Sequence, residues 1–288
     1  LMRELAPFIG ERVDIPAPDV NTNATIMGYM VDEYAKIKGQ FIPGVITGKP
    51  LSLGGSKGRG EATSLGGAHV LKAYLEAKNI DLKGLKVAVQ GLGNVGYHIV
   101  KILHDWRAVV VAVSDSKRAL YKADGLPIDT IFSGEKLVEI ITDKSISEIT
   151  NAELLILPVD VLIPAAISHQ ITKGNVDQIQ AKIILEMAND PITTEADPVL
   201  EKRGVVVIPD ILANAGGVLV SYFEWVQNSS NDYWTLEKVH QELESKMKQV
   251  MHEVLAHCKA GDTSHLRTLS YRLAAKRIIE AERARGRV

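Results

Sequence analysis

The feature that most constrains the fold of this chain is a glycine-rich segment, Gly91-Leu92-Gly93-Asn94-Val95-Gly96, which joins an apolar run to a helical pattern. The run at 85–90 has the length of a buried strand, and apolar residues recur at helical spacing over 94–105. In such a unit, Gly91 permits the tight turn, Gly93 lets a pyrophosphate approach the backbone, and Gly96 allows the helix to pack closely on the strand. The context predicts a dinucleotide site, with the first N–H groups of the helix facing the phosphates.

A second prediction concerns the acid that follows the next strand. That strand is predicted at 109–113, and Asp115 lies just beyond it, where an acid in dinucleotide-binding folds accepts hydrogen bonds from the adenosine ribose. Its charge repels a 2′-phosphate and therefore favours NAD. Ser116 and the basic pair Lys117-Arg118 beside it are able to bind that phosphate, so NADP stays open.

Alternation of helical and strand patterns along the middle of the chain defines the fold class. A helix is predicted at 62–78, and after the second strand come further short apolar runs, predicted as strands at 153–157, 162–164, 182–187 and 205–208. This alternation indicates an α/β fold, a doubly wound Rossmann-type sheet that is mostly parallel. The C-terminal third is predicted to form helices at 212–227, 235–259 and 265–284.

The N-terminal part of the chain is organised differently. Residues 1–10 have the pattern of a helix end, and two prolines hold 14–19 extended. One of Asn21, Thr22 and Asn23 is expected to cap a helix at 24–38. A stretch rich in glycine and proline at 39–60 has little periodicity, which makes it the best candidate for a domain boundary.

Composition narrows the classes of function. The formal net charge of −2 gives no electrostatic footprint for nucleic acid or an acidic membrane surface, and no apolar run approaches a membrane span. Cys258 is the single cysteine, and no cluster of cysteine and histidine has metal-ligand spacing, so neither a disulfide nor a metal site is expected. We expect a cytoplasmic protein that acts on a small molecule.

Three polar segments outside the glycine motif are candidates for chemistry, and each has a purely structural alternative. Asp19 is interpreted first as a turn or cap residue, and alternatively as a buried carboxylate for proton transfer. Thr63 is either a helix cap or a hydrogen-bond partner of a nicotinamide carboxamide. The segment from Pro209 to Val218 follows a predicted strand, where ligands gather in open α/β sheets, and its adjacent glycines fit either a ligand or a tightly packed neighbour.

Taken together, these motifs resemble those of the glutamate, leucine, phenylalanine and valine dehydrogenases, and of the glutamate dehydrogenases in particular. The resemblance covers nearly the whole chain and rests on DIPAPDVNTN (14–23), TGKP (47–50), GGSKGRGEAT (54–63), the glycine motif, VSDS (113–116), IPAA (163–166) and the segment 209–228. It implies reversible oxidative deamination of L-glutamate to 2-oxoglutarate and ammonia, with hydride transfer to NAD or NADP. It also implies a homo-oligomer, commonly a hexamer.

The resemblance further implies roles for individual residues. Asp19 matches the family's catalytic aspartate, which exchanges a proton with the substrate amine. Val218 and Ser221 match positions in the substrate side-chain pocket, where Ser221 would bind the distal carboxylate and so favour glutamate over apolar amino acids. The remaining matches surround the cofactor: Thr63, Asn94, Asn189 and Asn214.

The same resemblance suggests a domain organisation. Residues 1–46 are expected to belong to a partial substrate domain, 47–235 to a dinucleotide-binding Rossmann domain, and 236–288 to C-terminal helices that return to the substrate domain. The family's essential lysines belong to segments upstream of the match to Asp19. We therefore expect this chain alone to lack them, and its activity to depend on residues that precede Leu1.

Two smaller departures from the family pattern concern the cofactor domain. Met187 and Asp190 flank Asn189 where small residues are usual, and Trp106-Arg107 replaces a glycine turn before the second strand. Two other functions remain open at this point. One is a dehydrogenase of leucine, valine or phenylalanine; the other, given the absent lysines, is an inert nucleotide-binding module.

Overall fold

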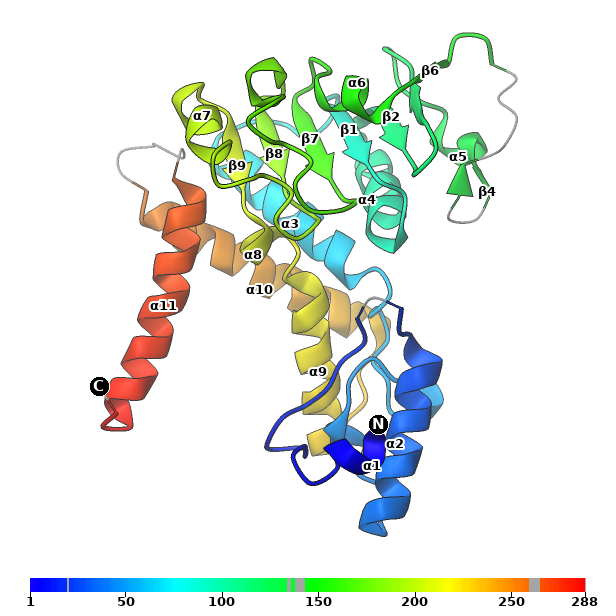
Figure 1. The fold of residues 1–288 in the computed structure, drawn as a ribbon, viewed down its shortest axis with the longest axis vertical. Coiled ribbons are helices and arrows are strands. Elements are labelled where there is room, and N and C mark those ends of the chain that lie inside the picture. The colour runs from blue at the N-terminus through cyan, green and yellow to red at the C-terminus, as the bar shows by residue number, and fades with distance from the viewer. Residues whose placement is uncertain (20, 134–135, 138–142, 259–264, 288) are drawn as a thin grey trace. The chain divides into compact units, whose positions relative to one another are not determined.

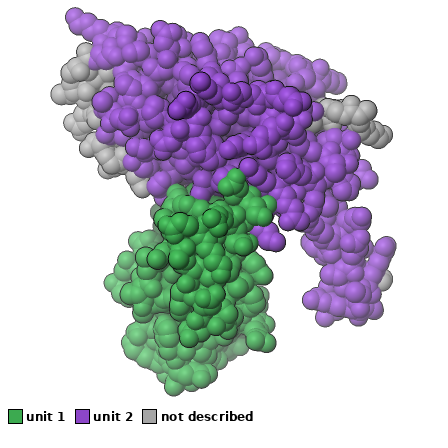
Figure 2. All heavy atoms as spheres, turned by 180° about the vertical axis from the view of Figure 1, so that it is seen from behind, with its two compact units in different colours: residues 1–62, 216–245 green, residues 63–215, 246–288 purple. Residues whose placement is uncertain are grey.

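The computed structural model describes residues 1–19, 21–133, 136–137, 143–258 and 265–287. The chain forms two compact units, which Figure 2 shows in different colours. The first unit comprises residues 1–62 and 216–245, and the second comprises residues 63–215 and 246–288.

The second unit is built on a seven-stranded sheet of order β6-β3-β2-β1-β7-β8-β9 (Figure 1). Strands β2, β1, β7, β8 and β9 are parallel; β3 pairs antiparallel with β2, and β6 pairs antiparallel with β3. The bounds are β1 Lys86–Gln90, β2 Val109–Ser114, β3 Ala119–Tyr121, β6 Ser147–Ile149, β7 Val161–Pro164, β8 Ile183–Leu185 and β9 Val206–Ile208. The predicted doubly wound, mostly parallel sheet is confirmed.

The position of β1 in this order matters for function. The chain passes from β1 to β2 on one side and later returns to β7 on the other side of β1. Gln90 at the end of β1 is in register with Ser114 of β2 and with Pro164 of β7. A topological switch point therefore lies at the carboxyl end of β1, the place where open α/β sheets bind ligands.

Helices and a small hairpin complete the second unit. Strands β1 and β2 are almost entirely buried, as expected of central parallel strands with covered faces. The connecting elements are α3 Ala62–Ala77, α4 Asn94–Asp105, α5 Ile128–Ile131, the hairpin of β4 Phe132–Ser133 and β5 Lys136–Leu137, α6 Asn151–Leu155, η3 Val176–Gln178, α7 Asp197–Lys202, α8 Asp210–Ala213, the second half of α10 Leu236–Ala256, and α11 Leu266–Ala284.

One predicted strand is wrong. The run at 153–157 was expected to be a buried strand from its apolar content, but residues 151–155 form helix α6. Thr150 caps this helix: its side chain accepts a hydrogen bond from the Glu153 N–H, and the Glu153 carboxylate accepts one from the Thr150 N–H. This capping box favours helix at the start of the segment and decides against a strand of the same apolar content.

The helix predicted at 212–227 is interrupted. Helix α8 ends at Ala213, and α9 (Gly216–Ser230) begins three residues later. Asn214 ends α8, with its N–H donating to the Asp210 carbonyl, and its side-chain amide donates to Asn189. Two glycines follow, which are weak helix formers, so the helix breaks at the residue that makes a side-chain contact elsewhere.

The first unit is a small helical unit with its own core. It contains α1 (Met2–Leu5), α2 (Ala24–Lys38), two short 3₁₀ turns η1 (Pro43–Val45) and η2 (Leu51–Leu53), α9 and the first half of α10. Asn23 is the residue that caps α2, accepting from the Ile26 N–H. Its buried core includes Met27, Val31, Tyr34, Val45 and Ile46. The compact units differ from the predicted boundaries at 46/47 and 235/236, because the segment 47–62 packs with α9.

The end of α4 carries a strained residue at one of the departures noted above. Arg107 has φ +68°, a left-handed conformation. Its N–H donates to the His104 carbonyl and the Ala108 N–H to the Leu103 carbonyl, the two hydrogen bonds of a Schellman motif. Glycine is the usual residue at this position, because it has no Cβ to strain.

Arg107→Gly is therefore expected to raise the free energy of unfolding by about 0.5–1 kcal/mol, since relief of the left-handed strain outweighs the extra backbone entropy of glycine. Urea denaturation of the protein measures this change. Lys101→Gly, in the interior of the same helix, is the matched control and is expected to lose about 1 kcal/mol. An Arg107→Gly variant no more stable than the parent would contradict the assignment of strain.

Candidate functional site

The turn between β1 and α4 has the geometry that the sequence predicted. Gly91 has φ +95°, and a Cβ placed there would come within 2.7 Å of the Ala166 backbone, so only glycine fits. A Cβ at Gly96 would lie 1.8 Å from the Gly91 carbonyl oxygen. The Gly91 N–H donates to the Ser114 hydroxyl at 3.1 Å, which ties the turn to the end of β2.

The start of α4 is open to a ligand. Gly93 is the N-cap, and none of the described side chains caps the helix. A Cβ at Gly93 would meet no described heavy atom within 4 Å, apart from its chain neighbours, and Asn94 is exposed. Uncapped N–H groups in open space beside a glycine form an anion site, so these residues fit the pyrophosphate of a dinucleotide.

Asp115 and Ser116 lie at the carboxyl end of β2, beside the glycine turn. The Asp115 carboxylate accepts hydrogen bonds from the Lys117 and Arg118 N–H groups at 2.7 and 3.0 Å, which fix it in its loop. The Arg118 guanidinium pairs with Glu148 at 3.1 Å. Arg118, which the sequence analysis considered as a partner of a 2′-phosphate, is therefore already paired with a carboxylate.

Helix α3 brings Thr63 to the same region. Its neighbour Ser64 donates a hydrogen bond to the Val95 carbonyl in the first turn of α4 at 2.8 Å. One turn further along α3, a Cβ at Gly67 would lie 2.3 Å from the Met187 sulfur and 3.0 Å from the Ala213 carbonyl oxygen. Thr63 is the second residue of α3, which begins at Ala62.

The two asparagines assigned to the cofactor meet directly. The Asn214 amide donates to the Asn189 amide oxygen at 2.7 Å, which joins the loop after β8 to the end of α8. The neighbouring Asp190, one of the departures, has φ +48° and pairs with His169 at 2.8 Å. The structure therefore gathers the glycine turn and the predicted cofactor residues of the second unit along the carboxyl ends of five parallel strands.

Within the first unit, two sequence motifs fold onto each other. The Thr47 N–H donates to the Pro16 carbonyl at 3.0 Å, and a Cβ at Gly48, which has φ +74°, would lie 2.5 Å from the Pro18 ring. The Gly48 N–H in turn donates to the Glu224 carboxylate of α9 at 3.0 Å. DIPAPDVNTN, TGKP and α9 therefore form one local structure, although Val20 in the first motif lies outside the described residues.

Glu224 holds this local structure together from a fully buried position. Its carboxylate pairs with the Lys49 ammonium at 2.7 Å, and neither side chain is exposed. It also accepts from the Ser56 N–H, and the Lys49 ammonium donates a second hydrogen bond to the Ile46 carbonyl at 2.6 Å. Burial lowers the pKa of Lys49, and the charge of Glu224 opposes that shift. The pair is hydrogen-bonded on both sides, as a buried charge pair must be.

An open cavity of about 370 Å³ lies against α9 in the first unit. Val218 and Ser221, the two residues assigned to the substrate pocket, both line it, together with Ile15, Ala17, Thr47, Tyr222 and Trp225. Ser221 is almost fully buried, and its hydroxyl accepts a hydrogen bond from Arg59 Nε at 3.0 Å. The cavity therefore has mostly apolar walls, and the Ser221 hydroxyl in it lies beside a guanidinium.

Ala17 lines this cavity, and Asp19 follows it by two residues, a distance of about 7 Å along extended chain. Its carbonyl and N–H both bond to Thr22, which closes a turn before α2. Its side chain is exposed in this unit. The structure thus fits the turn interpretation of the backbone, and the expectation that the carboxylate is buried is wrong for the unit by itself.

The sequence did not single out Arg59, Lys49 or Glu224. Arg59 is 162 residues from its partner Ser221, a separation at which no local pattern reports contact. Glu224 did carry a signal, because an acid in the apolar face of a helix needs a buried partner.

Among the residues that the structure describes, no helix combines the length and hydropathy needed to cross a lipid bilayer. No group of His, Cys, Asp and Glu side chains among them is arranged to hold a metal ion.

Comparison with known proteins links both units to one group of enzymes. The family model described as Glutamate/Leucine/Phenylalanine/Valine dehydrogenase matches residues 54–286, and that of the Glu/Leu/Phe/Val dehydrogenase dimerisation domain matches residues 1–36. The cryptic catabolic NAD-specific glutamate dehydrogenase of Bacillus subtilis is 43% identical over 287 residues, and the NAD-specific glutamate dehydrogenase of Staphylococcus aureus is 41% identical over 285 residues. Both alignments cover 99% of this chain and 66% and 69% of the relatives, so the chain spans about two thirds of their length.

Solved structures give the same picture. The hetero-hexameric glutamate dehydrogenase from Thermus thermophilus, in a leucine-bound form, superposes with a TM-score of 0.90 at 34% identity, covering 99% of this chain and 67% of that one. Glutamate dehydrogenase from Peptoniphilus asaccharolyticus superposes with a TM-score of 0.82 at 38% identity, covering 99% and 68%.

Proposed function

This chain belongs to the glutamate/leucine/phenylalanine/valine dehydrogenase family, and we propose on that basis that it catalyses the reversible, NAD-dependent oxidative deamination of L-glutamate to 2-oxoglutarate and ammonia. The observation that carries the choice of substrate is the buried Ser221 hydroxyl beside the Arg59 guanidinium, in a cavity whose other walls are mostly apolar. Such a cavity suits an amino acid with a short apolar stem and a distal carboxylate.

The second unit would hold the cofactor, which accepts a hydride from the substrate when bound. Gly91, Gly93 and the uncapped start of α4 fit the pyrophosphate, and Asp115 fits the adenosine ribose. The engagement of Arg118 by Glu148 and the negative charge of Asp115 both support NAD over NADP. Thr63, Asn189 and Asn214 would surround the nicotinamide half.

The first unit would hold the substrate side chain. Ser221 accepts a hydrogen bond from Arg59, so its own hydroxyl proton is able to point to the distal carboxylate of glutamate. Burial lowers the pKa of Arg59, with the charge of Glu224 opposing that shift, and a guanidinium is still fully protonated. Its positive charge therefore adds to the attraction for a carboxylate.

Asp19 would manage the proton of the substrate amine. A carbon loses a hydride readily only when the amine that it carries is unprotonated. A base must therefore first take the proton of the substrate ammonium. Asp19 is an exposed carboxylate two residues from Ala17, which lines the cavity that holds Val218 and Ser221. The same group returns the proton in the reverse direction.

Ser221→Leu is expected to lower kcat/KM for L-glutamate by roughly 10²-fold, because the distal carboxylate loses a hydrogen bond and meets an apolar group instead. The dissociation constant of NAD should stay unchanged. Steady-state kinetics with titration of NAD test both statements. Ser230→Leu, on the same helix but exposed, is the matched control. Glutamate kinetics equal to those of the parent would refute the role of Ser221, and with it the preference for glutamate over apolar amino acids.

The assembly and cellular location form a further part of the proposal. One relative is hetero-hexameric, residues 1–36 match a dimerisation domain, and the first unit exposes large apolar side chains such as Phe8 and Tyr29. These observations support a homo-oligomer, with a hexamer the expected form, which light scattering measures directly. The single cysteine supports a cytoplasmic location.

A further inference from the structure

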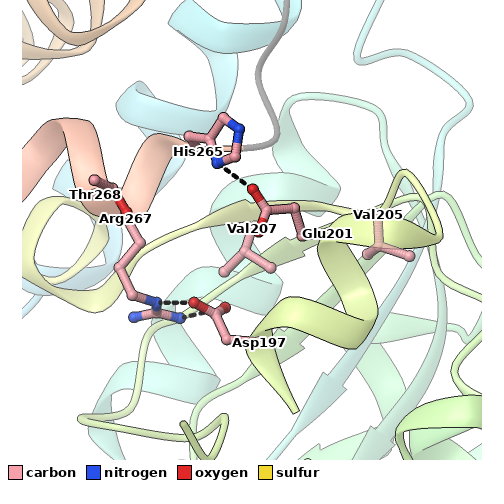
Figure 3. A pocket seen from close by; sticks show the side chains of 7 residues that line it. All are labelled: Asp197, Glu201, Val205, Val207, His265, Arg267 and Thr268. Atoms are coloured by element: carbon pink, nitrogen blue, oxygen red, sulfur yellow. Dashed lines mark hydrogen bonds and ion pairs between the residues drawn. The ribbon is translucent and has the colours of Figure 1, made fainter. Parts of the chain in front are cut away.

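The C-terminal helix α11 contributes one side chain to a charge cluster in the second unit. Arg267 donates two hydrogen bonds to the Glu186 carboxylate, at 2.7 and 2.9 Å, and two more to Asp197, at 2.9 and 3.3 Å. Figure 3 shows the paired contacts between Arg267 and Asp197, next to the separate pair of His265 and Glu201. Arg267 also lies 3.7 Å from Asp210. One guanidinium thus joins the ends of β8, α7 and α8 to α11.

Glu186 is the centre of this cluster and is completely buried. Burial raises the pKa of its carboxyl, against the two hydrogen bonds from Arg267 that favour the ionised form. Burial alone would lower the pKa of Arg267, but the bonds to Glu186 and Asp197 raise it instead. A buried carboxylate without its charged partner destabilises the folded protein, so the position of Glu186 depends on Arg267.

Two loops extend from the cluster to the cofactor residues. Glu186 directly follows β8 and precedes Asn189 by three residues. Its second oxygen accepts from the Asp210 N–H at 2.8 Å, at the start of the helix that ends in Asn214. The Asp210 carboxylate accepts from the Asp190 N–H at 2.9 Å. The loops 186–190 and 209–214 are therefore fastened to each other at the cluster, and again by the bond between Asn189 and Asn214.

We propose that Arg267 is a positioning residue, which sets the geometry of Asn189 and Asn214 for the nicotinamide half of NAD through Glu186 and Asp210. It touches neither cofactor nor substrate and acts only through these loops. The inference rests on the proposed function, because that function places the two asparagines at the nicotinamide. The adenosine half would be held by different elements, the glycine turn and Asp115, and no hydrogen bond found among the described residues joins these elements to the cluster.

The test compares NAD with ADP, a probe of the adenosine half alone, by titration calorimetry on the whole protein. Arg267→Met is expected to weaken NAD binding by about 10- to 100-fold, the effect of a small displacement of contact groups, and to leave ADP binding unchanged. Asp210→Ala keeps the buried pair of Arg267 and Glu186 but removes the acceptor of the Asp190 N–H. This variant is expected to show the same loss of affinity for NAD with unchanged affinity for ADP. It replaces Arg267→Met in the test if Arg267→Met does not fold.

Arg277→Met is the matched control, because Arg277 lies on the same helix in an exposed pair with Glu253, and both ligands should bind it as they bind the parent. Equal NAD affinity in the folded variants and the parent would overturn the inference. Parallel losses for NAD and ADP would overturn it too, since they indicate a general structural role. A parent protein that binds ADP but not NAD would instead overturn the proposed function itself, and the inference with it.

Discussion

Asp19→Asn is expected to lower the turnover of L-glutamate by about 10²- to 10⁴-fold, the contribution of a positioned acid–base group, with NAD binding left as in the parent. The amide has nearly the same shape as the carboxylate but cannot take a proton from the substrate ammonium. The turn that holds residue 19 depends on backbone bonds to Thr22, so the substitution leaves it intact. Pre-steady-state rates of NADH formation, together with NAD titration, measure the two effects separately.

Asp14→Asn is the matched control, because Asp14 is an exposed acid in the same motif. Its turnover should equal that of the parent. Turnover by Asp19→Asn at more than a tenth of the parental rate would be incompatible with a proton role for Asp19. Loss of NAD binding in the same variant would point to a structural defect and not to chemistry.

The second large effect concerns the buried ion pair of the first unit. Lys49→Met is expected to lower the free energy of unfolding by about 3–5 kcal/mol, because the fully buried Glu224 carboxylate loses the ammonium that is hydrogen-bonded to it. The loss of stability should depend on the Glu224 carboxylate that Lys49→Met leaves unpaired. In the double variant Lys49→Met and Glu224→Gln, no buried charge remains and the amide oxygen still accepts from the Gly48 or Ser56 N–H, so it should be more stable than Lys49→Met.

Chemical denaturation of the three proteins checks this order. Lys36→Met is the matched control, since Lys36 forms an exposed i,i+4 pair with Asp32, and its denaturation midpoint should hardly move. A double variant less stable than Lys49→Met would contradict the account of Glu224, and a small loss in Lys49→Met would show that the pair contributes little.

The sheet of the second unit could largely be predicted from the sequence, for a physical reason. Strand β1, the glycine turn and α4 are set by local rules: apolar content, the conformational needs of Gly91 and helical periodicity. Strands β3 and β6 were not predicted, because β6 is largely polar and exposed and β3 is a short apolar run between Arg118 and Lys122. Helix α6 was mistaken for a strand because its apolar residues suit both structures, and only the capping box distinguishes them.

In the candidate site, contacts set by local sequence could be predicted, whereas contacts between residues far apart in the chain could not. The place of Gly91, Gly93 and Asp115 follows from the order of strands, so their proximity could be predicted. The contact of Arg59 with Ser221 and that of Arg267 with Glu186 join residues far apart in the chain, and they depend on packing that periodicity does not report. Family resemblance assigned Asn189 and Asn214 separately, and the structure adds the hydrogen bond between them.

The initial rate of NADH formation by the full-length protein, with L-glutamate compared with leucine, valine and phenylalanine, tests the central claim most directly. We expect NAD to be reduced and kcat/KM for glutamate to exceed that for each apolar amino acid by at least about 10²-fold, the discrimination that a buried hydrogen-bonding group supplies. Equal or faster turnover of an apolar amino acid would contradict the assignment of the cavity lined by Ser221 to a distal carboxylate. Absence of NAD reduction with all four substrates would contradict the proposed function as a whole.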